Sequence, residues 1–197
     1  MTIEVFDNVF VEDDAQIIHD TMSEKSFSWH YYHKSSRDKK SEIYHWHKFG
    51  GHNEKELIEN GFDWVMPIWH HIMYKYKLDD LCGIKTFRRI YFNAHTYGIE
   101  PLPHRDDGDF TMIYYPDMKW KKDWGGGTAI WKEDTTEIEK HVDYTGNRLV
   151  IFPAKRLHQA LPINLGCYRL RTCMVFKVYL DAPDGRLEFY ENNEEDS

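Results

Sequence analysis

The feature that most constrains the fold is a series of short, strand-like segments in the second half of the chain. Glycine, proline, aspartate and asparagine separate these segments, as they separate the strands of antiparallel barrels and sandwiches. The sequence therefore predicts a mainly β core of this kind. The segments cover residues 84–94, 110–115, 128–131, 148–152 and 169–180.

The first 83 residues mix helix and strand signals. Apolar spacing over residues 54–76 predicts a helix that covers a sheet, with interruptions at Gly61 and Pro67. Residues 34–40 are polar and mostly basic, which is typical of an exposed loop, and such a loop is a candidate border of a substrate groove. Further elements are expected, namely a short strand near residues 3–6, a helix near 13–22 and a strand over 26–33.

Length and charge favour one globular domain. The 197 residues suffice for a single buried core, with residues 1–83 as an α/β support, 84–181 as the β core and 182–197 as an acidic tail. The net charge is −8, and the tail carries five of these charges, so the folded body is nearly neutral. A nucleic-acid partner is therefore not indicated. The five charges belong to Glu188, Glu191, Glu194, Glu195 and Asp196.

The cysteines and the first residues of the chain indicate the cellular compartment in which the protein is expected. Cys82, Cys167 and Cys173 form no Cys-x-x-Cys pair, which fits free thiols in a reducing environment. No basic region followed by an apolar stretch opens the chain, and no run of about 18 apolar residues occurs in it. We expect a cytoplasmic protein without a membrane partner.

Two His-x-Asp pairs are candidates for metal binding. Side chains two residues apart on a strand face the same side, so such a pair can present an imidazole nitrogen and a carboxylate oxygen to one ion. The pair His104 and Asp106 follows a turn and precedes a strand, where the mouth of a barrel would open. The pair His141 and Asp143 precedes a turn and is interpreted as part of a hairpin.

A second histidine would complete a facial triad of the kind that holds non-haem Fe(II) with open positions. His158 is the candidate, because it follows the apolar run 149–152 and a short link. The alternative for His158 is a rim histidine hydrogen-bonded to a loop. Spacing alone leaves both interpretations open.

Several ordered motifs together resemble the 2-oxoglutarate/Fe(II)-dependent oxygenases, in particular the prolyl-4-hydroxylase-like branch with its small bacterial and phage members. The resemblance covers roughly residues 84–180, whereas the N-terminal third matches only loosely. The motifs are Tyr91 to Gly98, His104 to Asp106, Phe110 to Tyr115, Trp120 with Trp124 to Thr128, Gly146 to Phe152, His158 to Pro162 and Leu170 to Lys177.

This resemblance implies a double-stranded β-helix, the cupin-like jelly-roll, packed on helices from the N-terminal part. His104, Asp106 and His158 match the metal ligands of the family, in agreement with the spacing argument. The implied cofactors are Fe(II), 2-oxoglutarate and O2, with ascorbate as a candidate reductant. The implied reaction is hydroxylation of an unactivated C–H bond with release of succinate and CO2.

The resemblance also suggests residues for 2-oxoglutarate. An arginine on the strand after the second histidine grips the distal carboxylate in this family, since its planar fork makes two parallel charge-assisted hydrogen bonds. Arg171 fits that position better than Arg169, although both are expected on one face of the strand. Tyr115 matches a tyrosine that reaches the same carboxylate, and Thr128 matches an inward position beside the cosubstrate.

The substrate is the least determined part. A peptidyl residue, proline first, is favoured by the branch, and Asn93, Tyr97 and Arg105 are candidates for substrate contact at the mouth. An oxygenase acting on a small molecule or a nucleobase is one alternative. A cupin-type module that binds metal or sugar without oxygenase activity is another, as is a catalytically silent scaffold.

Overall fold

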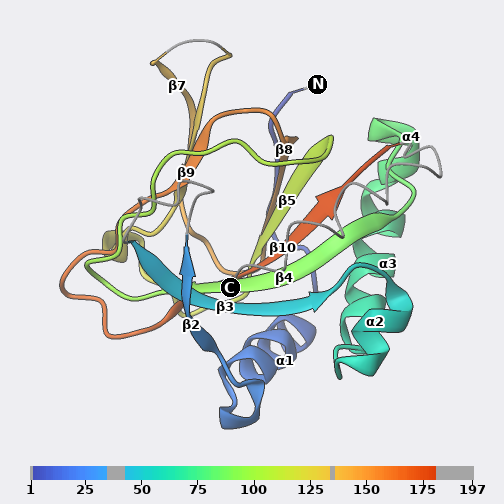
Figure 1. Cartoon of the computed structure of the whole chain (residues 1–197), viewed down its shortest axis with the longest axis horizontal. Helices are drawn as coiled ribbons and strands as arrows, with labels where there is room; N and C mark the ends of the chain where they lie inside the picture. The colour runs from blue at the N-terminus through green and yellow to red at the C-terminus, as the bar shows by residue number, and fades with distance from the viewer. Residues whose placement is uncertain (1, 35–42, 134–135, 181–197) are drawn as a thin grey trace.

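A computed structural model describes residues 2–34, 43–133 and 136–180 of the chain. Its described part contains two antiparallel sheets and several helices (Figure 1). The major sheet has seven strands in the order β1-β8-β5-β10-β4-β3-β2, and the minor sheet has three in the order β7-β6-β9. The mainly β architecture and the jelly-roll core expected from the sequence are confirmed.

The strands of the major sheet come from both parts of the chain. Edge strands from the first 51 residues extend the sheet on both sides of the strands predicted as the core. The bounds are β1 (Glu4–Phe6), β2 (His30–Lys34), β3 (Tyr44–Gly51), β4 (Phe87–His95), β5 (Phe110–Tyr115), β8 (Arg148–Pro153) and β10 (Arg171–Val178). The minor sheet consists of β6 (Thr128–Trp131), β7 (Ile138–Val142) and β9 (His158–Ala160).

The alternation of side chains along the major sheet creates two apolar cores. On β10, Met174 and Phe176 face the helices, while Cys173 and Val175 face the minor sheet. Figure 1 shows α1 and β7 on opposite sides of the central strands. The resulting order of layers is helices, major sheet and minor sheet, which explains why every residue of β10 is buried.

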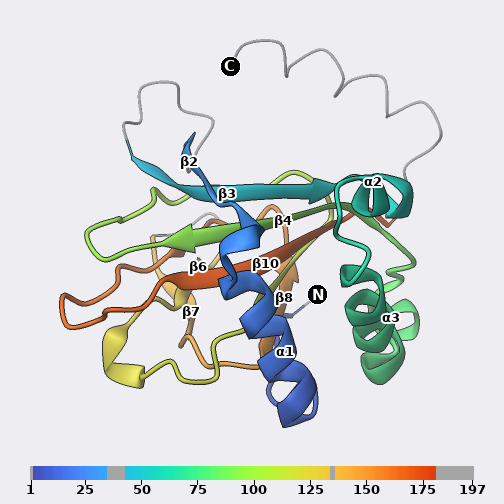
Figure 2. The ribbon, with the colours of Figure 1, turned by 90° about the horizontal axis from the view of Figure 1, so that it is seen from below.

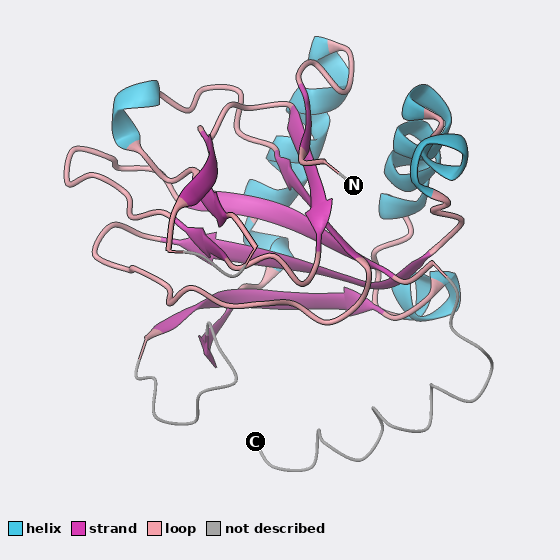
Figure 3. Cartoon of the chain, turned by 90° about the horizontal axis from the view of Figure 1, so that it is seen from above, coloured by secondary structure: helices cyan, strands magenta, loops and turns pink. Residues whose placement is uncertain are grey.

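The helices pack against one face of the major sheet and lie at the periphery of the strands (Figure 3). Trp69 of α3 fixes this packing by contacting Phe87 and Phe176, with ring centroids 5.3 and 5.6 Å apart. The bounds are α1 (Glu12–Ser23), α2 (Glu54–Glu59), α3 (Val65–Tyr76) and α4 (Leu78–Cys82), with short 3-10 turns at Lys25–Phe27 and Lys122–Trp124.

The predicted helix over 54–76 is divided as expected at Gly61, which adopts a positive φ of 77°. The second predicted interruption is wrong, because Pro67 lies in the first turn of α3. A proline is tolerated there because the N–H groups of the first turn have no partner within the helix.

Three strand predictions need correction. The start of the strand predicted over 26–33 falls in the 3-10 turn, and β2 begins only at His30. Strand β3 has no counterpart among the predicted segments, since its alternating histidines and lysine make it look polar. The segment predicted over 169–180 is shorter at both ends, and β10 begins only at Arg171. The predicted loop 34–40, apart from Lys34 at the end of β2, and the tail 182–197 lie outside the described residues.

Candidate metal and cosubstrate site

The three predicted metal ligands lie together at the rim between the two sheets. One ligand atom from each of His104, Asp106 and His158 lies within 4.8 Å of the others. The backbone holds the two histidines side by side, because each donates its N–H to the carbonyl of the other at 2.9 Å. Asp106 is fixed in the same way, with its N–H donating to the Ala154 carbonyl at 2.9 Å.

Both histidines of this triad present the nitrogen that a metal needs. The Nδ1 of His104 lies 3.0 Å from the Leu102 carbonyl, and that of His158 lies 2.9 Å from the Arg156 carbonyl. A carbonyl oxygen only accepts, so each Nδ1 carries the proton and each Nε2 keeps a free lone pair. Two imidazoles and one carboxylate on one side of an ion form the donor set that suits Fe(II).

The Asp106 carboxylate is held ionised by its surroundings. Burial raises the pKa of Asp106, but the contact with His158 and the Lys177 ammonium outweigh it and hold this pKa well below its ordinary value. Thr111 also donates to the carboxylate at 2.6 Å. Burial, followed by the neighbouring His158, lowers the pKa of His104, which favours the neutral, ligand-competent ring.

Arg171 lies on the face of β10 that looks toward the minor sheet and is 1% exposed. Its Nε donates to the Gly126 carbonyl, and its Nη1 lies 3.8 Å from the Cys173 sulfur. None of the ion pairs between described residues involves it. A buried cation without a carboxylate partner is costly, so this position fits an anionic ligand.

Arg169 has a different environment, although it is only two residues away. It precedes β10, so the expected common face with Arg171 is not formed. Its Nε and Nη2 donate to the two carboxylate oxygens of Asp117 at 2.5 and 2.9 Å, and Nη2 also lies 3.0 Å from His19. This guanidinium is already paired within the chain.

Hydroxyl groups and aromatic rings surround the Arg171 guanidinium. Its central carbon lies 5.6 Å from the ring of Tyr115 and 5.7 Å from that of Tyr144. The Tyr115 hydroxyl lies 2.6 Å from the Thr128 hydroxyl. Burial raises the pKa of Tyr115, so its phenol stays neutral and can donate a hydrogen bond to an anion.

The glycine run before Thr128 allows the chain to approach Arg171 closely. Gly126 has a φ of 77°, and a Cβ there would lie 3.1 Å from Trp120 and 3.2 Å from the Arg171 side chain. A larger residue at position 126 would therefore press on the guanidinium as well as strain the backbone.

The predicted substrate residues lie in different places. Asn93 faces inward from β4, where its Oδ1 lies 2.8 Å from His47 Nδ1. Tyr97 is exposed in the turn after β4, and Arg105 donates to the Lys155 carbonyl beside the triad. The second His-x-Asp pair is on the surface as part of the β6–β7 hairpin, with His141 and Asp143 in a 3.7 Å contact.

Three residues of this region were missed by the sequence analysis. Lys177, 1% exposed on β10, donates to Asp106 and to Thr111, the latter at 3.3 Å. His95 is the register partner of Arg171 on β4, and Tyr144 stacks on Tyr115 with centroids 4.5 Å apart. The sequence did contain a signal for Lys177. It lies an even number of residues after Arg171 on the same strand, so the two side chains face the same side of the sheet.

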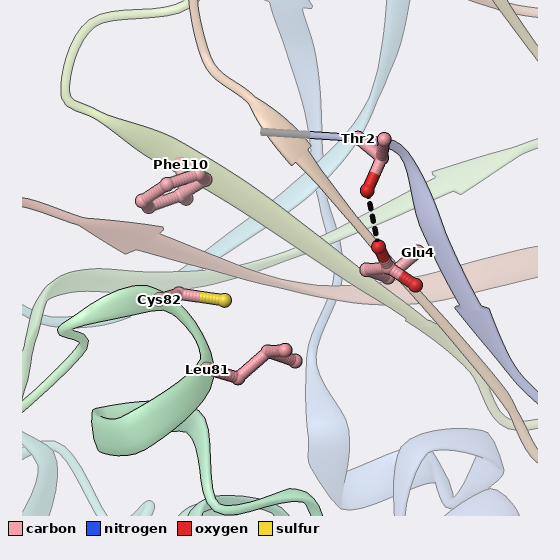
Figure 4. Close-up of a pocket in the computed structure, with 5 residues that line it drawn as sticks. All are labelled: Thr2, Glu4, Leu81, Cys82 and Phe110. Atoms are coloured by element: carbon pink, nitrogen blue, oxygen red, sulfur yellow. Dashed lines mark hydrogen bonds between the residues drawn. The ribbon is translucent and has the colours of Figure 1, made fainter.

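A pocket of about 500 Å³ lies elsewhere, between β1, α4 and β5 (Figure 4). None of the candidate site residues lines it, and the Thr2–Glu4 hydrogen bond drawn there is exposed. This pocket therefore adds nothing to the chemistry of the triad. Its lining residues are Thr2, Glu4, Leu81, Cys82 and Phe110.

The fold and the candidate triad together fit a jelly-roll protein that holds one metal ion at its rim. Residues 89–179 match the family model described as the 2OG-Fe(II) oxygenase superfamily. Over these residues, a little under half of its length, the chain is similar to the 2-oxoglutarate-dependent dioxygenases. Fe(II), 2-oxoglutarate and O2 are the cofactors and cosubstrates implied by this family, and the match favours an oxygenase over the cupin-type alternative.

Solved structures share the fold at low sequence identity. A prolyl-4-hydroxylase of Pseudomonas putida superposes with a TM-score of 0.64 at 13% identity, covering 89% of this chain and 92% of that one. A prolyl hydroxylase of Trichoplax adhaerens, in complex with a peptide fragment of hypoxia inducible factor, gives 0.61 at 14% identity with coverages of 90% and 83%.

A viral collagen prolyl hydroxylase from Paramecium bursaria Chlorella virus-1 gives a TM-score of 0.55 at 13% identity, with coverages of 90% and 96%. No curated protein matches by sequence. Within the described part of the chain, no helix has the length and apolar character needed to cross a bilayer.

Proposed function

We propose that this dioxygenase hydroxylates a peptidyl residue, most simply proline, with His104, Asp106 and His158 holding Fe(II) and Arg171 binding 2-oxoglutarate. The observation that carries the proposal is the buried Arg171 guanidinium, which no carboxylate of the described chain neutralises. Its neighbour Tyr115 belongs to the same apolar cluster as Phe152, whose ring contacts that of His158. An elongated dicarboxylate fits a site with a metal at one end and a cation at the other.

The two ends of this site are proposed to bind different groups, the metal ion at one and the distal carboxylate of 2-oxoglutarate at the other. At the metal end, the backbone bonds between His104 and His158 fix the two rings, and Asp106 contributes the negative charge. When bound, Fe(II) with 2-oxoglutarate and O2 supplies the oxidant for C–H hydroxylation, and succinate and CO2 are released.

At the other end, Arg171, Tyr115 and Thr128 provide donors for the distal carboxylate of 2-oxoglutarate. Arginine offers two parallel N–H donors and Tyr115 a neutral hydroxyl in a water-poor setting, where such bonds are strong. Arg169 is assigned no part in this binding, because its guanidinium already donates two hydrogen bonds to the Asp117 carboxylate.

The peptide preference rests on the folds that resemble this one, which are prolyl hydroxylases and in one case carry a peptide. Tyr97 and Arg105 are proposed to contact that peptide from the loop between β4 and β5. Asn93 is proposed to act from inside, through its contact with His47. Residues 84–181 form the catalytic part in this proposal, and residues 1–83 support it.

The proposal also covers the compartment in which the reaction takes place and the reductant that supports it. Cys82, Cys167 and Cys173 are free thiols, which supports a reducing compartment such as the cytoplasm. Ascorbate is proposed as a reductant that restores Fe(II) after unproductive turnover. Both points are tested by activity with and without ascorbate in reducing buffer.

The substrate is tested by incubating the protein with Fe(II), 2-oxoglutarate and a panel of proline-containing peptides, each matched to a peptide with alanine in place of proline. Mass spectrometry should find one added oxygen atom on the proline peptides alone, together with stoichiometric succinate. Succinate formation without peptide oxidation across the panel would overturn the peptide assignment while leaving the dioxygenase class intact.

A further inference from the structure

A second group of histidines lies on the two strands at one edge of the major sheet. His33 belongs to β2, and His45 and His47 belong to β3. One ring nitrogen from each lies within 4.8 Å of the others, as close as the ligand atoms of the triad. This histidine cluster shares no residue with the triad. Figure 2 shows β2 and β3 beside β4 and β10. We call β4 and β10 the cosubstrate wall, because β10 carries Arg171 and β4 carries its register partner His95.

His45 is the buried member of the cluster. It is 3% exposed, and neither of its ring nitrogens has a hydrogen-bond partner among the described residues. Leaving a buried polar group unpaired costs about 1–3 kcal/mol, so such groups usually have a partner. A ligand at the cluster would provide one.

His47 is already oriented for a metal. Its Nδ1 lies 2.8 Å from the amide oxygen of Asn93, which only accepts, so Nδ1 carries the proton and Nε2 keeps its lone pair. This arrangement is the one by which an outer hydrogen bond fixes the tautomer of a metal-binding histidine. The ring of His33 stacks on that of His47, with centroids 3.9 Å apart and planes 12° apart.

The protonation of the cluster also suits a metal. Burial, followed by the charge of His33, lowers the pKa of His45 to about 3 and that of His47 to about 4. Burial and Arg89 lower the pKa of His33 as well. The rings are therefore neutral near pH 7, which is the form that donates to a metal ion.

We propose that His33, His45 and His47 form a second metal site that takes a divalent transition ion, with Zn²⁺ as the ion of choice. Three neutral imidazoles without a carboxylate favour such borderline ions over Mg²⁺ or Ca²⁺, which prefer oxygen. The His33 side chain is only partly enclosed by its neighbours, so water can reach the fourth position of a tetrahedral ion. This inference does not depend on the proposed substrate.

The site has a structural consequence for the cosubstrate wall. A metal bound by residues of both strands would join β2 to β3. His45 contacts His95 with ring centroids 5.0 Å apart, and His95 is the register partner of Arg171. The ion would therefore brace the sheet two strands away from the buried arginine, at the edge where β2 has no further neighbour among the described strands.

The test is the zinc stoichiometry of the full chain. Chelator-treated protein is equilibrated with Zn²⁺, dialysed and analysed by mass spectrometry of the metal. Because the triad is expected to bind Zn²⁺ as well, the comparison uses the wild type, an Asp106→Ala/His158→Ala variant, a His45→Gln/His47→Gln variant and the combination of both. We expect two ions, one, one and none, respectively.

The control is His70→Gln, which replaces an exposed histidine of α3 and should keep both ions. The second readout uses Co²⁺ in the Asp106→Ala/His158→Ala background, where strong visible bands typical of four-coordinate Co²⁺ should disappear after His45→Gln/His47→Gln. His33→Gln changes only an exposed ring, so it preserves the fold and should weaken Zn²⁺ binding in that background at least about tenfold.

Two results would overturn the second site. One is an Asp106→Ala/His158→Ala protein that is folded by circular dichroism yet retains no Zn²⁺. The other is retention of that ion with unchanged affinity after substitution of His33, or of His45 and His47 together.

Discussion

The two groups of histidines in this molecule differ in how they are built. The triad of His104, Asp106 and His158 comes from a loop and the minor sheet, and backbone hydrogen bonds fix both of its rings. The histidine cluster of His33, His45 and His47 comes from edge strands, and a side-chain amide fixes one ring. The triad contains a carboxylate and the cluster has none.

This difference predicts different chemistry. Two imidazoles and a carboxylate leave coordination positions of a metal ion open for other ligands. The Arg171 guanidinium in the same region of the fold can bind an anionic cosubstrate. The histidine cluster would hold an ion by three neutral imidazoles, and none of its ligands is charged. The first arrangement suits catalysis and the second suits stabilisation of the edge strands.

The largest expected effect is the loss of the carboxylate from the triad. Asp106→Ala should weaken Fe(II) binding by more than about 100-fold, the upper range for outer-sphere substitutions, and should abolish succinate formation. Asp143→Ala, in the surface His-x-Asp pair, is the matched control and should leave both unchanged. Equal losses in the two variants would contradict the assignment. Anaerobic Fe(II) titration provides the measurement.

The next effect separates the two arginines. Arg171→Ala should raise the KM for 2-oxoglutarate by about 10- to 100-fold, because a charge-assisted pair of hydrogen bonds is lost. Arg169→Ala should leave KM within about threefold and lower the free energy of unfolding by about 3 kcal/mol, because the buried Asp117 carboxylate would lose both guanidinium hydrogen bonds. The reverse order of KM values would exchange the roles of these residues.

A smaller effect is expected at Lys177, whose ammonium contacts the Asp106 carboxylate. Lys177→Met should bind Fe(II) about fivefold more tightly, because a positive charge beside the ligand opposes a dication. Lys140→Met, at an exposed lysine of β7, should change the affinity little. Weaker Fe(II) binding in folded Lys177→Met would instead make the lysine a support of the carboxylate.

The smallest effect concerns His19, which lies outside both groups of histidines. Burial lowers its pKa, although Asp117 opposes the shift. The unfolded chain therefore binds the proton more readily, so stability is lost as the pH falls below about 6.5. His19→Gln should flatten the dependence of unfolding free energy on pH by no more than about 1 kcal/mol per pH unit. Urea unfolding at pH 7 and 5.5 measures it, and identical slopes would refute the shift.

The sequence predicted the triad because its spacing follows local rules. His104 and Asp106 are two residues apart beside a turn, and His158 follows an apolar run, so strand periodicity made them candidates, and the family resemblance then selected His158 as the second histidine. Arg171 required the family resemblance, since its distance from His158 is large. The common face expected for Arg169 failed because β10 begins at Arg171, and a strand boundary depends on pairing with β4.

The histidine cluster could not be predicted in the same way. His45 and His47 are two apart, but they lie on a strand whose polar residues concealed it, and His33 belongs to another strand. Only the antiparallel pairing of β2 with β3 brings the three rings together. Lys177 was missed for a related reason, because its contact with Asp106 depends on the packing of β10 against the loop after β4.

The most direct test of the central claim is an anaerobic titration of Fe(II)-loaded wild-type protein with 2-oxoglutarate, followed by visible absorption. We predict a weak charge-transfer band that saturates with one 2-oxoglutarate per triad, requires Asp106 and appears only at higher 2-oxoglutarate in Arg171→Ala. A folded, iron-loaded wild-type protein that shows no band, or a band unaffected by Arg171→Ala, would contradict the proposed cosubstrate site.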